Sequence, residues 1–330
     1  MEPLFDLGLQ ATRWLQATYP QLEGFFRFIS TLGLEEFYLA IVPLIYWSID
    51  KRLGRNLAYV FLFTNSWNVL FKHALRGPRP FWFDSSLELW PEDSYGIPSG
   101  HAQMATAVYL FIAGWLRKGW VWFVAVLGVI LMGVSRVYLG AHFIHDVVAG
   151  ILISLIILIG YIIWQQRFAM PFGKRILGYR LMIAILVPIG LALLYVVIRL
   201  LIGAPDESVQ WAAYIPVAEL AGLEGMATAV GSLLGAGIGL TLENGRVRFK
   251  TQGSLWQRLL RFLLGIIVTL ALWRGLSLIF PADPLWLGIP LRIFRYAITL
   301  LWVAYYAPML FVRLRLAEAE PAPQITMTPP

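Results

Sequence analysis

Nine runs of mostly apolar residues follow one another along the chain, each near the ~20 residues that an α-helix needs to cross a bilayer. Polar or charged segments separate the runs, as is typical of loops between membrane-spanning helices. The runs are 34–50, 53–73, 101–116, 120–135, 143–164, 180–202, 214–241, 256–280 and 287–312. The pattern predicts an all-α, polytopic membrane protein with about nine spans.

The two ends of the chain lack such runs. Residues 1–33 mix apolar side chains such as Trp14 with charged ones such as Arg13, which favours an amphipathic segment lying on the membrane surface. Residues 317–330, AEAEPAPQITMTPP, are polar and rich in proline, which predicts a disordered tail.

Composition supports a membrane protein. Of the 330 residues, 59% are apolar and 14% are charged, compared with ~45–50% and ~25% in soluble domains. These values exclude a soluble enzyme and a disordered chain. The absence of cysteine excludes a disulfide framework, a thiolate metal site and a cysteine nucleophile. The net charge of +7 could serve nucleic-acid binding, but membrane topology also requires basic loops, so we expect no nucleic-acid partner.

Basic residues follow every odd-numbered span, which assigns those loops to the cytoplasm by the positive-inside rule. They are Lys51, Arg52 and Arg55; Arg117 and Lys118; Arg167, Lys174, Arg175 and Arg180; Arg246, Arg248 and Lys250; and Arg313 and Arg315. The segments after the second and fourth spans then lie on the opposite, extracytoplasmic face. We expect the functional site there, because those segments hold an unusual concentration of ionisable residues.

Three short motifs meet on that face. They are Lys72-HALRGP-Arg79-Pro80 after the second span, Pro98-Ser99-Gly100-His101 before the third, and Ser135-Arg136-VYLGA-His142-FIH-Asp146 between the fourth and fifth. Three cations brought together favour a phosphate group, which guanidinium groups bind in bidentate geometry. The backbone N–H groups at a helix start, near Ser99 and Gly100, also bind anions.

The two histidines of these motifs add reactive chemistry to the phosphate-binding groups. Beside a bound phosphoryl group, His101 and His142 can divide the roles of nucleophile and general acid. Asp146 follows His142 by four residues, on the same helical face, where it can accept a ring proton and select the tautomer.

The motifs resemble the signature KxxxxxxRP, PSGH and SRxxxxxHxxxD of the type-2 phosphatidic acid phosphatase (lipid phosphate phosphatase) superfamily, which is related to vanadium haloperoxidases. Within it, LGLEEFY at 32–38, the Trp47–Arg55 segment and SRVYLGAHFIHD are similar to the sphingosine-1-phosphate phosphatase-like branch. The resemblance implies a catalytic core over 34–166. The four spans within 167–316 lie outside the resemblance and form a C-terminal extension to which it assigns no role.

The resemblance also implies a role for each motif residue, without a metal or other cofactor. His142 is the nucleophile that forms a phosphohistidine, Asp146 orients it, and His101 protonates the leaving group and later activates water. The groups that hold the phosphoryl oxygens are Lys72, Arg79, Ser99, Gly100 and Arg136. The expected activity is hydrolysis of a lipid phosphate or pyrophosphate. Transfer of the phosphoryl group to another lipid, and transport using the cations for binding alone, remain alternatives.

Two features of the extension have more than one interpretation. Arg292 and Arg295 either form ion pairs within the extension or bind a second anionic group of the substrate. Gly231 and Gly235, four residues apart in the glycine-rich span 214–241, favour close helix packing inside the subunit, with homo-oligomerisation as the alternative.

Overall fold

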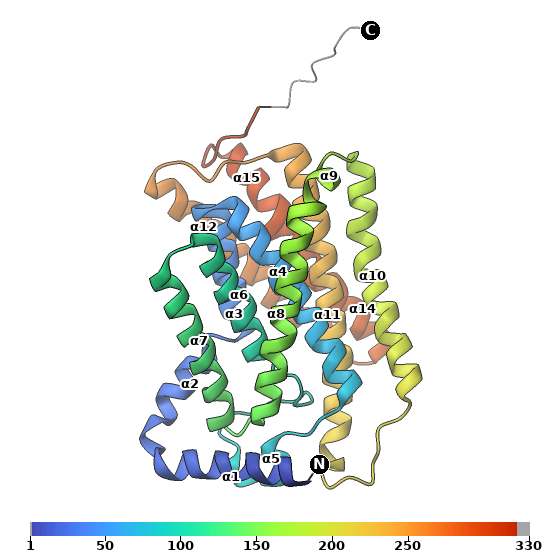
Figure 1. Cartoon of the computed structure of the whole chain (residues 1–330). Helices are drawn as coiled ribbons and strands as arrows, with labels where there is room; N and C mark the ends of the chain where they lie inside the picture. Colours follow the sequence, from blue (N-terminus) through green and yellow to red (C-terminus); the bar gives the residue numbers. More distant parts are fainter. Residues whose placement is uncertain (1, 322–330) are drawn as a thin grey trace.

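The computed structural model describes residues 2–321 as a bundle of long helices (Figure 1). No strand is assigned within that range, apart from one isolated bridge between Phe249 and Ala319. The helices are α1 (Glu2–Thr18), α2 (Glu23–Thr31), α3 (Glu35–Leu44), α4 (Lys51–Leu75), α5 (Pro80–Phe83), α6 (Gly100–Leu116), α7 (Gly119–Tyr138), α8 (Ile144–Arg167), α9 (Ala169–Gly173), α10 (Leu177–Ile202), α11 (Ile215–Leu242), α12 (Leu255–Leu270), α13 (Leu276–Ile279), α14 (Leu285–Leu301) and α15 (Ala307–Arg313). The all-α membrane class is confirmed.

The predicted count of nine spans is not confirmed. Within the described residues, six helices are long and apolar enough to cross a membrane, or seven if the pair Pro20–Thr31 and Glu35–Ile49, bent by 50°, forms one broken span. The predicted spans 53–73 and 101–116 correspond to α4 and α6, which are not among them.

The positions of α4 and α6 inside the bundle explain this difference. Helix α4 contacts α6, α8 and α11, and buries polar side chains such as those of Asn56, Thr64 and Asn68. Helix α6 has 17 residues and contacts α4, α7 and α8. A helix surrounded by protein can carry polar groups that a lipid-facing helix cannot, because neighbouring helices satisfy their hydrogen bonds.

The N-terminal helix α1 lies across one end of the bundle, at the bottom of Figure 1. Thr12 on its inner side donates a hydrogen bond from Oγ1 to Val137 O over 3.1 Å. Leu7 and Trp14 are 60% and 58% exposed. Apolar side chains on the outer side of a helix that closes the bundle suit the predicted position at a membrane surface.

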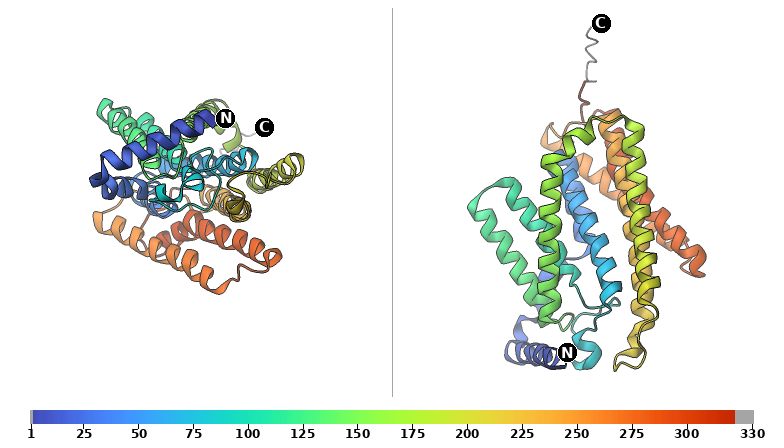
Figure 2. Two further views of the ribbon diagram at one scale, coloured as in Figure 1. Left: turned by 90° about the horizontal axis from the view of Figure 1, so that it is seen from below. Right: turned by 45° about the vertical axis from the view of Figure 1, so that its right-hand side comes forward.

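Helices α11 and α14 pack closely through the two glycines singled out in the sequence. A Cβ atom on Gly231 would lie 2.4 Å from Ile293 O, and one on Gly235 would lie 2.1 Å from Ala297 O. Figure 2 shows α12 and α14, in orange and red, as a layer on one side of the bundle. The face of α11 that carries these glycines is therefore occupied within the subunit.

We expect Gly235→Ala to destabilise the protein by about 1–3 kcal/mol, because the added methyl group meets a backbone oxygen that cannot move aside locally. Thermal unfolding in detergent should show a lower midpoint. The matched control is Gly190→Ala on α10, where no atom lies within 4 Å of the added carbon. An unchanged midpoint for Gly235→Ala would contradict this packing of α11 on α14.

The start of the predicted tail is ordered. Lys250 N donates to Glu318 O over 2.8 Å, and Glu320 N donates to Arg248 O over 2.8 Å. These hydrogen bonds join residues 318–320 to residues 248–250, and this backbone pairing explains why the start of the tail is ordered. The rest of the predicted tail, 322–330, lies outside the described residues.

Candidate active site

Helix α4 and the loop that follows it place two cations, Lys72 and Arg79, in the site. Helix α4 ends where Arg76 adopts the left-handed conformation, so the chain turns away after Lys72 has been placed on its last turn. Lys72 Nζ donates to Ser94 Oγ over 3.1 Å and also to Tyr95 O. Arg79 Nη2 donates to the same two oxygens, each over 3.1 Å. One short loop segment therefore holds both cations in place.

The turn between α7 and α8 positions the third motif. Gly140 has a φ of +69°, and a Cβ there would lie 2.0 Å from Leu87 O, so the turn requires glycine. Asp146 Oδ2, in the first turn of α8, accepts a hydrogen bond from Phe143 N over 3.0 Å. The same oxygen lies 3.3 Å from His142 Nδ1.

The surroundings of His142 keep its imidazole neutral. Its side chain is 1% exposed, and Nε2 lies 3.2 Å from Arg79 Nη1. Burial lowers the pKa of His142 well below its usual value, and the positive charges of Arg79, Lys72 and Arg136 lower it further. A neutral imidazole retains the lone pair that a nucleophile needs.

The start of α6 brings the PSGH motif beside His142. Ser99 is fully buried, and its backbone N donates to Asp146 O over 2.9 Å. Its Oγ caps the helix by accepting from Ala102 N over 3.5 Å. A Cβ on Gly100 would lie 3.3 Å from Asn68 Oδ1, so this backbone is closely approached by α4. His101 and Gly100 line the same cavity as His142.

Glu92 is a member of this cluster that the sequence did not identify. Its Oε1 lies 2.6 Å from Arg136 Nη2 and 3.6 Å from His101 Nδ1, and its Oε2 lies 3.5 Å from Arg79 Nη2. Burial of the carboxyl would raise its pKa, but the surrounding positive groups lower it to about 2, so Glu92 is ionised. A single acidic residue in a polar loop carries no spacing signal, and its position depends entirely on how the loop folds back.

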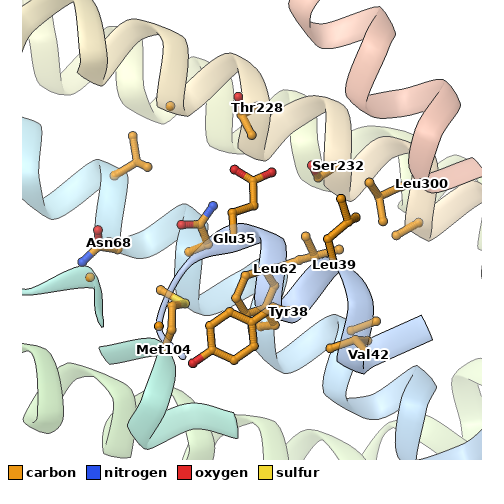
Figure 3. A pocket seen from close by; sticks show the side chains of 18 of the residues that line it. Glu35, Tyr38, Leu39, Val42, Leu62, Asn68, Met104, Thr228, Ser232 and Leu300 are labelled. Atoms are coloured by element: carbon orange, nitrogen blue, oxygen red, sulfur yellow. The ribbon is translucent and has the colours of Figure 1, made fainter. Parts of the chain in front are cut away.

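A cavity of about 400 Å³ extends from this cluster into the bundle (Figure 3). Lys72, His101 and His142 line one part. The rest has mostly apolar walls from α3, α4, α11 and α14. Labelled in Figure 3 are Glu35, Tyr38, Leu39 and Val42 of the α3 segment, Leu62 and Asn68 of α4, Met104 of α6, Thr228 and Ser232 of α11, and Leu300 of α14. The C-terminal extension thus forms a wall of the cavity, a role the sequence did not indicate.

Glu219 of α11 joins the extension to the motif loops. Its Oε1 accepts a hydrogen bond from Tyr95 Oη over 2.9 Å and lies 3.1 Å from Arg76 Nε. Tyr95 in turn accepts hydrogen bonds from Lys72 and Arg79 at its backbone oxygen. The position of the extension is therefore coupled to the loop that holds the cations.

Two predicted residues do not reach the site. Arg292 Nη1 lies 2.9 Å from Glu224 Oε2, and Arg292 Nε donates to Thr228 Oγ1 over 3.0 Å. Arg295 packs over the ring of Tyr296, with 5.0 Å between the guanidinium carbon and the ring centroid. Neither arginine lines the cavity. The contacts of Arg292 favour the ion-pair interpretation over a second headgroup site.

The fold and the site define a polytopic helical membrane protein with a buried cluster of cationic side chains beside two histidines. Residues 53–170 match the PAP2 superfamily, and residues 227–319 match the PAP2 superfamily phosphatase, transmembrane extension. The chain belongs to the PAP2 superfamily. No solved structure matches it.

Several curated phosphatases are similar to this chain. Glucose-6-phosphatase catalytic subunit 1 of Rattus norvegicus is 33% identical over 183 residues, which cover 46% of this chain and 51% of that protein. Sphingosine-1-phosphate phosphatase 2 of Mus musculus is 33% identical over 147 residues, 40% of each chain. Glucose-6-phosphatase 3 of Rattus norvegicus is 29% identical over 228 residues, 59% of this chain and 62% of that protein. The matched region spans about half the length of these relatives.

Proposed function

We propose that this protein is a membrane phosphatase that hydrolyses a phosphate monoester or pyrophosphate through a phosphohistidine at His142. The observation that carries the proposal is the setting of this imidazole: Nδ1 lies 3.3 Å from Asp146 Oδ2, and Nε2 lies 3.2 Å from Arg79 Nη1. A neutral imidazole oriented in this way has Nε2 on the side of the cations, where a bound phosphoryl group would lie.

The reaction has two steps. His142 Nε2 forms a bond to phosphorus while the bond to the leaving oxygen breaks, and His101 gives that oxygen a proton. Water then attacks the phosphohistidine with His101 as base, which releases phosphate and regenerates His142. The groups that stabilise the charge on the phosphoryl oxygens are Lys72, Arg79 and Arg136, together with Ser99 and Gly100 at the start of α6.

An amphiphile is the substrate class that best fits the cavity. Apolar side chains such as Leu39, Val42 and Leu62 form its walls beyond the cations, which suits an alkyl chain whose phosphate reaches His142. The relatives are named for glucose 6-phosphate, a sugar phosphate, and for sphingosine 1-phosphate, a lipid. The apolar walls favour the lipid.

The distribution of charge supports an active site on the extracytoplasmic face. Basic loops such as 51–55, 174–180 and 246–250 gather at the upper end of the bundle in Figure 1, opposite the end where α5 and the start of α8 lie. The positive-inside rule assigns the upper end to the cytoplasm. The phosphate would then enter from the periplasm, lumen or exterior.

Phosphate release from a panel of substrates tests the proposal. The purified protein should release phosphate from sphingoid, phosphatidate-like or polyprenyl phosphates faster than from glucose 6-phosphate, because only the lipids fill the apolar cavity. Vanadate should inhibit by occupying the phosphoryl position. EDTA should not, because Lys72, Arg79 and Arg136 supply the positive charge that a metal would otherwise provide.

Three results would change the assignment. Loss of activity in EDTA would indicate a metal-dependent reaction. Uptake of a phosphorylated lipid by proteoliposomes without phosphate release would favour a transporter. Appearance of the phosphoryl group on an added acceptor lipid, in place of free phosphate, would favour a phosphotransferase.

A further inference from the structure

Each of the two site histidines has a carboxylate beside its Nδ1 atom. The first pair is His142 and Asp146, at 3.3 Å. The second pair is His101 Nδ1 and Glu92 Oε1, at 3.6 Å. His101 Nε2 is buried and has no hydrogen-bond partner among residues 2–321. The second imidazole therefore has one nitrogen next to a carboxylate and the other available to a bound molecule.

The charges around His101 oppose its protonation, apart from Glu92. The charged or titratable groups that act on it from the packed elements are Lys72 of α4, Arg79 and Glu92 of the loops, Arg136 of α7 and His142 of the α7–α8 turn. Uncharged neighbours of the ring are Gly33, whose Cβ would be 2.5 Å from His101 Cδ2, and the ring of Trp90. The ion pairs of the described residues give His101 one carboxylate, that of Glu92.

We infer that Glu92 is a positioning residue for the reaction: its carboxylate orients His101 so that Nε2 faces the leaving oxygen, and it stabilises the imidazolium that forms once a bound phosphate offsets the charges of the surrounding cations. The inference rests on the proposed function. As His142 Nε2 bonds to phosphorus, the electron pair of the breaking P–O bond stays on the leaving oxygen. The Nε2 proton of His101 moves to that oxygen, so His101 becomes neutral and the product is an alcohol. Glu92 remains ionised throughout.

Substrates with different leaving groups test this role. An alkyl alkoxide needs a proton as it departs, but p-nitrophenolate is stable without one. In purified, full-length Glu92→Gln protein, kcat/KM should fall about 10- to 100-fold on dodecyl phosphate and change by less than about threefold on p-nitrophenyl phosphate. The alkaline limb of the pH profile on dodecyl phosphate should move down by about 1 pH unit, because the neutral amide no longer stabilises the imidazolium.

Two further variants complete the experiment. Glu92→Asp restores the charge and should recover most of the activity on dodecyl phosphate. Asp93→Asn removes the neighbouring, exposed carboxylate and should keep both activities. Equal losses on the two substrates, or a change in KM alone, would overturn the inference, since Glu92 would then act on phosphate binding through Arg136. Failure of the wild-type protein to release phosphate from either substrate would overturn the proposed function itself.

Discussion

Purified His142→Ala protein is expected to lose phosphate release altogether, with kcat lower by on the order of 10⁴-fold or more. His142 Nε2 faces Arg79, 3.2 Å from Nη1, while the carboxylate of Asp146 lies beside the other ring nitrogen. Neither water nor the alanine side chain can form the covalent intermediate in its place. The measurement is phosphate release from a sphingoid phosphate in detergent at saturating substrate.

The thermal unfolding midpoint provides the control for this variant. Burial disfavours the charged form of His142, and its neighbours are mainly cations, so alanine should leave the fold intact and the midpoint close to the wild-type value. Turnover retained by a well-folded His142→Ala protein would rule out the phosphohistidine and require another nucleophile.

Arg79→Lys is expected to lower kcat/KM by about 10²–10³-fold, even though the positive charge is kept. The guanidinium donates from Nη1 to Ala141 O over 2.8 Å and from Nη2 to Tyr95 O over 3.1 Å, and it also lies beside His142 Nε2. A single ammonium cannot span these positions and still face a phosphoryl group. Phosphate release and inhibition by vanadate should both weaken.

Arg76→Lys is the matched control for this substitution. Arg76 lies three residues away and pairs with Glu219, at 3.1 Å, outside the cluster of groups proposed to hold phosphate. It should keep kcat/KM within about threefold, because an ion pair with part exposure tolerates exchange of one cation for another. Wild-type activity in Arg79→Lys would mean that charge alone, without guanidinium geometry, serves the site.

The motif residues could be predicted because their positions at helix ends, in this order along the chain, place them at the same end of the bundle. Lys72 lies in the last turn of α4, His101 lies in the first turn of the next long helix, α6, and His142 lies at the junction of α7 and α8. Antiparallel neighbouring helices return to the same end of a bundle, so residues at alternate junctions come together. The structure brings these three residues to the wall of a single cavity, as that argument requires.

Glu92 and Glu219 could not be predicted in the same way. Glu92 lies in the segment 84–99, much of which is irregular, and Glu219 belongs to α11, more than a hundred residues later. Neither residue has a periodic or motif relation to the groups that it contacts. Their contacts depend on loop folding and on the packing of α11 beside α4, which are long-range properties.

The number of spans shows the same limit. Apolar runs in the sequence report where helices form, because hydrophobicity and helix length are local properties. Helices α4 and α6 nevertheless lie inside the bundle, where polar side chains such as that of Asn68 are satisfied by other helices. Local hydropathy does not distinguish a helix that faces lipid from one that faces protein.

The amino-acid sequence was sufficient for the all-α membrane class, for the helix positions and for the cationic and histidine residues that the structure brings together, since each follows from local composition or motif order. Tertiary packing decided that α11 and α14 wall the cavity, that Arg292 pairs with Glu224 away from it, and that Glu92 lies against His101. The reason is that such contacts join residues far apart in the chain, and their free energy depends on neighbours that no local pattern encodes.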